Sequence, residues 1–111
     1  MRPKDDPPSD ADELRAIWEE HRPTTFARVA ALERAVALLA EGRLGDGDAR
    51  SARREAHSLS GAVSFFGYDE ASRIAAELET IFSDATGADP DRLHDMVVKL
   101  RSELERLPYT S

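Results

Sequence analysis

The chain of 111 residues contains no cysteine, and only 6% of its residues are aromatic. Disulfides, thiolate metal sites and cysteine redox chemistry are therefore excluded. No apolar run approaches the ~18 residues that a membrane-spanning helix needs, and the first residues lack the apolar core of a signal peptide. We therefore expect a cytoplasmic protein that does not associate with membranes.

Positive charge is also scarce, with 15 Lys and Arg residues against 22 Asp and Glu and a formal net charge of −7. A general nucleic-acid binder needs a basic face to displace counterions from phosphates, so we expect no nucleic-acid partner. The three histidines, His21, His57 and His94, lie on different segments without helical ligand spacing. No metal site is expected from them.

Helix-forming residues are abundant. Alanine, leucine, arginine and glutamate dominate and β-branched residues are few, which favours an all-α fold.

The length of the chain fits one domain. Residues 1–10 contain three prolines and three aspartates and are expected to form a disordered lead-in. We expect the helical domain at 11–107 and a short C-terminal tail at 108–111.

The N-terminal part of this domain predicts two consecutive helices. A short one begins at Asp10 or Asp12 and runs to about His21, where Pro23 interrupts or kinks the chain. Pro23 also suits the first turn of a second helix that ends near Gly42. Their inward-facing residues are expected to be Leu14, Ile17 and Trp18, then Phe26, Val29, Leu32, Val36 and Leu39.

Three more helices follow, each with apolar residues at steps of three and four. Gly67 is the expected stop between the first two, and Asp89-Pro90 supplies an N-cap and a first-turn proline for the last. The expected inward positions are Ala52, Ala56, Leu59, Val63 and Phe66; Ala71, Ile74, Ala75, Leu78, Ile81 and Phe82; and Leu93, Val97, Leu100, Leu104 and Leu107. The prediction is an antiparallel up-and-down four-helix bundle with a short N-terminal helix and, as the expected oligomeric state, a monomer.

The most informative pair in the chain is His57 and Gly61. Glycine in a helix interior costs ~1 kcal/mol relative to alanine, and residue i+4 lies beside residue i on a helix. Gly61 therefore leaves the imidazole of His57 open to a large partner, or else allows another helix to approach closely. His57 is expected at the edge of the inward stripe, with an accessible ring.

The residues around His57 form a platform of one cation and small side chains: Arg53, Ser60, Gly61 and Ser64. Together with Arg50 and Arg54, Arg53 supplies local positive charge that can attract a phosphorylated acidic partner or an incoming phosphoryl group. An accessible neutral imidazole is a good nucleophile and can carry a phosphoryl group covalently.

These residues and their spacing resemble the histidine-containing phosphotransfer (HPt) domain. In that family a histidine is followed by leucine two residues later, glycine four later, another glycine ten later, and a leucine with a glutamate or glutamine near the end of the next helix. The corresponding positions here hold His57, Leu59, Gly61, Gly67, Leu78 and Glu79. The stretch from Gly61 to Ala75 resembles HPt domains that work with bacterial response regulators.

The resemblance implies a phosphorelay intermediate. His57 would accept a phosphoryl group from, and return it to, aspartate of response-regulator receiver domains, including those of a hybrid histidine kinase, and Glu79 would orient its ring. The chain would be a carrier without autokinase activity, because no nucleotide-binding glycine loop is present. Mg²⁺ would come from the receiver. Arg53, Arg54, Ser60, Gly61, Ser64 and Phe65 are the expected partner-binding residues.

One departure from the family leaves alternatives open. Many HPt domains have a lysine three residues after the histidine, where this chain has Ser60. Arg53 is a candidate source of the missing charge. The alternatives are a degenerate HPt-like module that binds receivers or other partners without phosphotransfer, and a helical scaffold or dimerisation domain in which His57 is incidental. Phe65 is expected on the surface or packed against the first helix, with a place in the core as the alternative.

Overall fold

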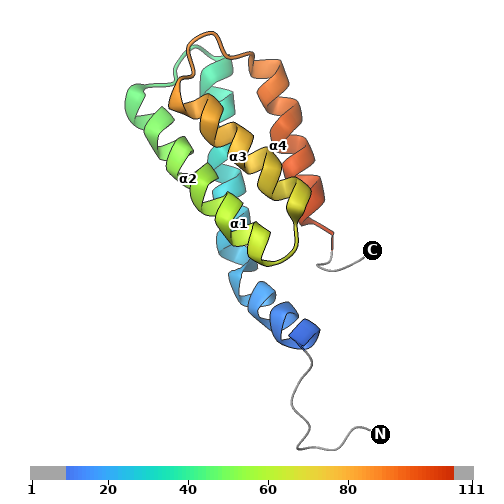
Figure 1. Ribbon diagram of the computed structural model, residues 1–111. Helices are drawn as coiled ribbons and strands as arrows, with labels where there is room; N and C mark the ends of the chain where they lie inside the picture. Colours follow the sequence, from blue (N-terminus) through green and yellow to red (C-terminus); the bar gives the residue numbers. More distant parts are fainter. Residues whose placement is uncertain (1–9, 107–111) are drawn as a thin grey trace, which may run out of the picture.

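The computed structural model describes residues 10–106, which form helices joined by short loops and contain no strand. The helices are α1 (Asp10–Ala40), α2 (Asp46–Phe65), α3 (Asp69–Ser83) and α4 (Pro90–Leu104) (Figure 1). The predicted all-α four-helix bundle is confirmed. The expected lead-in, apart from Asp10 at the start of α1, and the expected tail at 108–111 lie outside the described residues.

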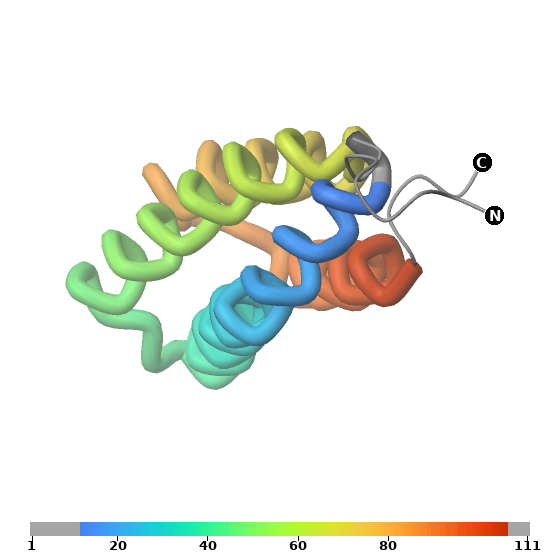
Figure 2. Tube along the Cα trace, turned by 90° about the horizontal axis from the view of Figure 1, so that it is seen from below, coloured from blue at the N-terminus to red at the C-terminus, as the bar shows by residue number. Residues whose placement is uncertain are grey.

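The helices pack as an up-and-down bundle. Each contacts the next in the chain, and α4 returns to α1. Figure 1 shows the loops α1–α2 and α3–α4 at one end of the bundle and the α2–α3 loop at the other. Seen along the bundle in Figure 2, α2 and α3 form one side, and their contact is the most extensive of all the helix pairs. At the seam between α2 and α3, the predicted site residues His57 and Glu79 meet.

The expected short N-terminal helix is not a separate element. α1 continues through Pro23, although proline offers no N–H to the Glu19 carbonyl and disturbs the helix there. The Thr25 hydroxyl donates a hydrogen bond to the His21 carbonyl at 3.0 Å in the same turn. Figure 1 shows the first turns of α1 inclined to the rest of the helix. Of the two predicted effects of Pro23, the kink is the one that occurs.

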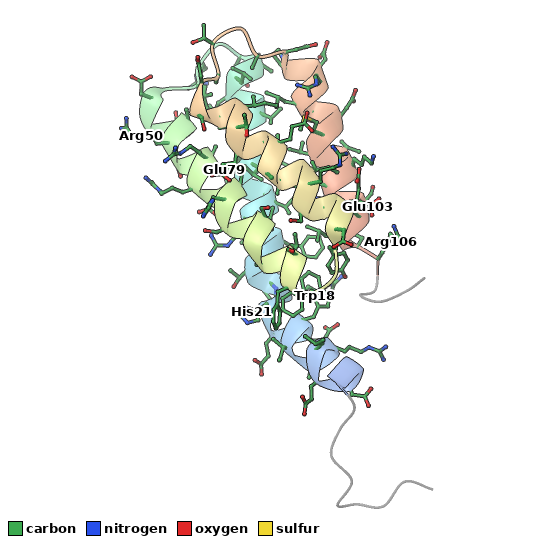
Figure 3. The ribbon with its side chains drawn as sticks, in the orientation of Figure 1. Trp18, His21, Arg50, Glu79, Glu103 and Arg106 are labelled. Carbon is green, nitrogen blue, oxygen red and sulfur yellow. The ribbon has the colours of Figure 1, made fainter. Side chains whose placement is uncertain are left out.

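Aromatic packing holds these first turns against the bundle. The Trp18 ring is buried, with its centroid 5.1 Å from that of Phe66 and 5.0 Å from that of Tyr68 (Figure 3). The Tyr68 hydroxyl in turn donates to the Arg106 carbonyl at 2.6 Å. Ile17, predicted to face inward, is 38% exposed. That prediction was wrong because these turns extend past the other helices, so that only their Trp18 side finds a partner.

The core agrees with the predicted stripes. Every expected inward position of α2, α3 and α4 within the described residues is buried, apart from Ile81, which is half-buried; Leu107 lies outside this range. In α1, Val29, Leu32 and Val36 are buried, whereas Leu14, Phe26 and Leu39 are half-buried. Burial of these residues orients the opposite face of each helix towards solvent.

Two predicted helix boundaries are confirmed by their hydrogen bonds. Gly67 ends α2 with a φ of 87°, which glycine adopts without the steric penalty of a side chain, and the Tyr68 N–H donates to the Val63 carbonyl at 3.1 Å. At the start of α4, the Asp89 carboxylate accepts from the Asp91 N–H at 3.0 Å. The first boundary fixes the reversal of the chain between α2 and α3.

Candidate functional site

His57 lies on the outer face of α2, close to the seam with α3. Its neighbours Ala56 and Leu59 are fully buried and fix the rotation of α2 about its axis. The His57 side chain is consequently 75% exposed. A ring held on a rigid helix with most of its surface in solvent is accessible to a macromolecular partner.

Glu79 lies directly beside this ring. Its two carboxylate oxygens are 3.1 and 3.0 Å from His57 Nδ1, and its side chain is 31% exposed. The next residue towards the N-terminus, Leu78, is fully buried and anchors the turn of α3 that carries Glu79. Figure 3 shows Glu79 on this helix. An ionised carboxylate only accepts hydrogen bonds, so Nδ1 carries the proton in this arrangement. In the neutral ring, the lone pair is then on Nε2.

The small residues beside His57 face solvent. Gly61 and Ser64 are exposed, and a Cβ atom built on Gly61 would meet no heavy atom within 4 Å. A glycine required for the close approach of a helix would show a neighbour there. Within the part of the chain that the structure describes, the alternative that Gly61 accommodates another helix is therefore wrong. The space beside His57 is open.

Ser60 has a different environment from the rest of the predicted platform. It is half-buried and its hydroxyl lies 3.1 Å from the Ser72 carbonyl oxygen, to which it donates. The Ser72 hydroxyl donates to the Ser60 carbonyl at 3.0 Å, and the two hydroxyl oxygens are 3.2 Å apart. These bonds join α2 to α3. Ser60, three residues after His57, thus faces α3 and contributes to packing.

Arginine side chains border the site on the N-terminal side of His57. Arg53 and Arg54 are exposed, and together with His57 they line a shallow depression of about 350 Å³ that also includes Ser58 and Glu79. Arg53 is four residues before His57, one turn away on the same face. The depression therefore brings together an imidazole, its carboxylate partner and two guanidinium groups.

Phe65 lies at the other end of α2. It is 63% exposed and contacts Phe66 edge to face, with ring centroids 5.2 Å apart, whereas Phe66 itself is only 3% exposed. Phe65 thus lies on the surface, as expected, and the core alternative was wrong. Its ring is therefore available for contact with a partner.

Reading the sequence alone missed the role of Ser72 and the place of Ser58 in the depression. The signal for Ser72 was weak: it is a small polar residue at the flank of the apolar stripe of α3, as Ser60 is on α2. Among residues 10–106, no group of three or more His, Asp or Glu side chains could hold a metal ion.

Comparison with known proteins gives one match. The family model described as Hpt domain matches residues 8–109, which is nearly the whole chain. No curated protein and no solved structure matches significantly. None of the described helices has the length and apolar character to cross a membrane. Hpt domains carry out phosphotransfer in two-component systems, where they interact with response-regulator receiver domains and kinases. By this match over its four-helix bundle, the chain belongs to the Hpt domain family.

Proposed function

We propose that the protein is a phosphorelay intermediate in which His57 Nε2 is the phosphoacceptor. The observation that supports this most is the pairing of His57 with Glu79. The carboxylate lies at Nδ1, so the reactive nitrogen is the one directed away from α3. The neighbouring position, Gly61, leaves open space for the phosphorylated partner.

The transfer step follows from this geometry. The Nε2 lone pair attacks the phosphorus of an aspartyl phosphate, an N–P bond forms, and the P–O bond to the partner's carboxylate breaks with its electron pair remaining on that carboxylate. The ring, still protonated at Nδ1, becomes positively charged, and the Glu79 carboxylate stabilises this charge through its hydrogen bond. Return of the phosphoryl group to a second aspartate is the reverse reaction, and no water is consumed.

The partner in this proposal is a receiver domain of a response regulator or of a hybrid histidine kinase. Mg²⁺ would be supplied by that receiver, where it would neutralise the phosphoryl oxygens during transfer. The protein itself would act as a carrier without autokinase activity, as a monomer and in the cytoplasm.

The experiment that tests the proposal is phosphoryl transfer from a panel of phosphorylated receivers in the presence of Mg²⁺. We expect an acid-labile, base-stable label on the wild type and on His94→Gln, a matched control at an exposed histidine of α4. His57→Gln should remain unlabelled, and ATP alone should label none of the three. Failure of every receiver to label the wild type, or equal labelling of His57→Gln, would contradict the proposal.

Ser60 supports a second candidate function, a module that binds receivers without accepting phosphate. The cation usual at this position is absent, and the Ser60 hydroxyl is engaged with Ser72. In the same experiment this alternative predicts receiver binding without any label. Arg53, four residues before His57, is the residue proposed to replace the missing charge, and Arg53→Gln should then slow labelling without preventing binding.

A further inference from the structure

The exposed face of α2 differs in chemistry from one end to the other. Three arginines precede His57 on this face, Arg50, Arg53 and Arg54, and we call them the basic strip. Gly61, Ser64 and Phe65 follow His57. With 3.6 residues per turn, all six residues lie within about 80° of His57 around the helix axis. The face runs over about 22 Å from Arg50 to Phe65, at about 1.5 Å per residue. The face therefore has charged side chains at one end, small side chains after His57 and an aromatic ring at the other end.

The basic strip is the part of this face that the bundle does not neutralise. Between Asp46 and Arg106, all the remaining Arg and Lys residues form salt bridges; they are Arg73, Arg92, Lys99, Arg101 and Arg106. The three arginines of the strip form none with described residues, in a protein with a net charge of −7. Like charges at spacings of three and four also destabilise a helix slightly. An acidic partner would neutralise them.

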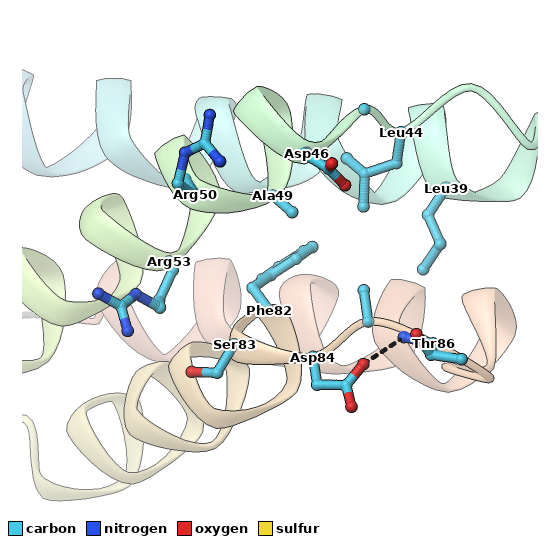
Figure 4. A pocket seen from close by; sticks show the side chains of 12 residues that line it. Leu39, Leu44, Asp46, Ala49, Arg50, Arg53, Phe82, Ser83, Asp84 and Thr86 are labelled. Atoms are coloured by element: carbon cyan, nitrogen blue, oxygen red, sulfur yellow. Dashed lines mark hydrogen bonds between the residues drawn. The ribbon is translucent and has the colours of Figure 1, made fainter.

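A groove continues the surface beyond the basic strip. It has a volume of about 600 Å³, is bordered by Arg50 and Arg53, and lies between the loops that precede α2 and α4 (Figure 4). The buried Phe82 ring lines it. In Figure 4 the guanidinium groups of Arg50 and Arg53 point away from Asp84, whose carboxylate instead accepts from the Thr86 N–H at 3.1 Å. The arginine heads are thus directed to solvent rather than to the acidic side chains of the groove.

Phe65 forms the aromatic end of this face. The exposed Phe65 ring packs edge to face against the buried Phe66 ring, and Phe66 in turn packs against the buried Trp18 ring of α1. Apolar contacts formed there are not screened by salt, whereas contacts with the basic strip are.

We propose that this polarised face docks a receiver domain in a single orientation, with an acidic edge of the receiver over the basic strip and an apolar edge over Phe65. This docking mode rests on the proposed relay function and specifies how the partner is recognised. The basic strip raises the association rate and selects receivers with an acidic edge. Phe65 lowers the dissociation rate of the complex. Reversed docking would place acidic groups against the aromatic ring and leave the arginines unpaired, so it is disfavoured.

The experiment measures association and dissociation rates for an Mg²⁺-loaded, unphosphorylated receiver at several salt concentrations. Arg50→Glu with Arg54→Glu should reduce the association rate at low salt by roughly tenfold, and high salt should largely remove this difference. The matched control reverses Arg15 and Arg34, two exposed arginines of α1. It should change the rate much less, although the net charge is the same.

The second arm of the experiment tests the aromatic end. Phe65→Ser should raise the dissociation rate by roughly tenfold and leave the salt dependence unchanged. Val98→Ser, at a residue of α4 that is 49% exposed, is its control. The orientation is tested directly by reversing acidic residues of the receiver, which should restore binding to the Arg50/Arg54 variant.

Any of three results would contradict the proposed docking mode. The first is an equal change in association rate when the basic strip or the control arginines are reversed. The others are a Phe65→Ser variant with the dissociation rate of the wild type, and self-association of the chain that depends on Arg50 and Arg54. The outcome is separable from that of the relay, because His57→Gln retains the whole face. If both sets of variants change the binding rates as expected but His57 is never labelled, the relay alone is refuted. If His57 is labelled but neither the arginine nor the Phe65 substitutions change the rates, the docking mode alone is refuted.

Discussion

Replacing Gly61 with alanine should make the protein more stable and less active. Gly61 lies in α2 without a positive φ, and a Cβ atom there meets no heavy atom within 4 Å. Alanine reduces the backbone entropy lost on folding, which is worth about 1 kcal/mol in a helix interior. The melting temperature should rise by roughly 4 °C.

The effect on transfer has the opposite sign if a receiver packs closely over His57. One added methyl group in a tightly packed contact costs about 1–3 kcal/mol, which weakens docking by roughly 5- to 150-fold. Thermal denaturation measures the first effect, and receiver binding with labelling of His57 measures the second.

Gly47→Ala is the matched control. Gly47 is also in α2, near its start, and a Cβ atom there also meets nothing within 4 Å. This variant should be at least as stable as the wild type and transfer normally. Equal docking and transfer by the two alanine variants would refute the idea that Gly61 makes room for the partner. A loss of stability in Gly61→Ala would refute the open space itself.

Three further outcomes are expected. Glu79→Gln keeps a hydrogen-bond acceptor but loses the charge, about 1.4 kcal/mol of stabilisation, so the rate of His57 labelling should fall roughly tenfold with little change in melting temperature. Hydrogen bonds from Arg73 and then Lys99 lower the pKa of Glu70 to about 2 from 4.5. Because the folded-state pKa is depressed, the stabilisation is present above pH 4.5 and disappears as the pH falls towards about 2. Wild type and Glu70→Gln should therefore differ in melting temperature near neutrality and converge in acid; a constant difference would contradict this. Gly67→Ala, at a φ of 87°, should lower the unfolding free energy by about 1–2 kcal/mol, and an unchanged value would show that the α2–α3 turn does not require glycine.

The parts of the fold that follow local rules could be predicted from the sequence. Periodic apolar residues identified the buried faces of α2, α3 and α4, and Gly67 and Asp89 marked helix ends. α1 was harder, because proline at position 23 is compatible with both a first turn and a kink. The packing of Trp18 on Phe66 and Tyr68 holds the preceding turns to the bundle, and long-range packing of this kind is not visible in local propensity.

The site shows the same division. Helical spacing placed Gly61 beside His57, and the family resemblance led to Glu79. The Ser60–Ser72 bonds depend on how helices face one another, as does the absence of salt bridges between described residues and Arg50, Arg53 and Arg54. Neither the neighbour of a half-buried hydroxyl nor the partner of a surface cation is determined by the spacing of residues in one helix.

The most direct measurement is nuclear magnetic resonance of the ¹⁵N-labelled imidazole of His57 after incubation with a phosphorylated receiver and Mg²⁺. Because Glu79 lies at Nδ1, the phosphoryl group should be bonded to Nε2, with ³¹P coupling to that nitrogen and a proton retained on Nδ1. A phosphoryl group on Nδ1, or its absence from His57 with every receiver tested, would contradict the proposed mechanism.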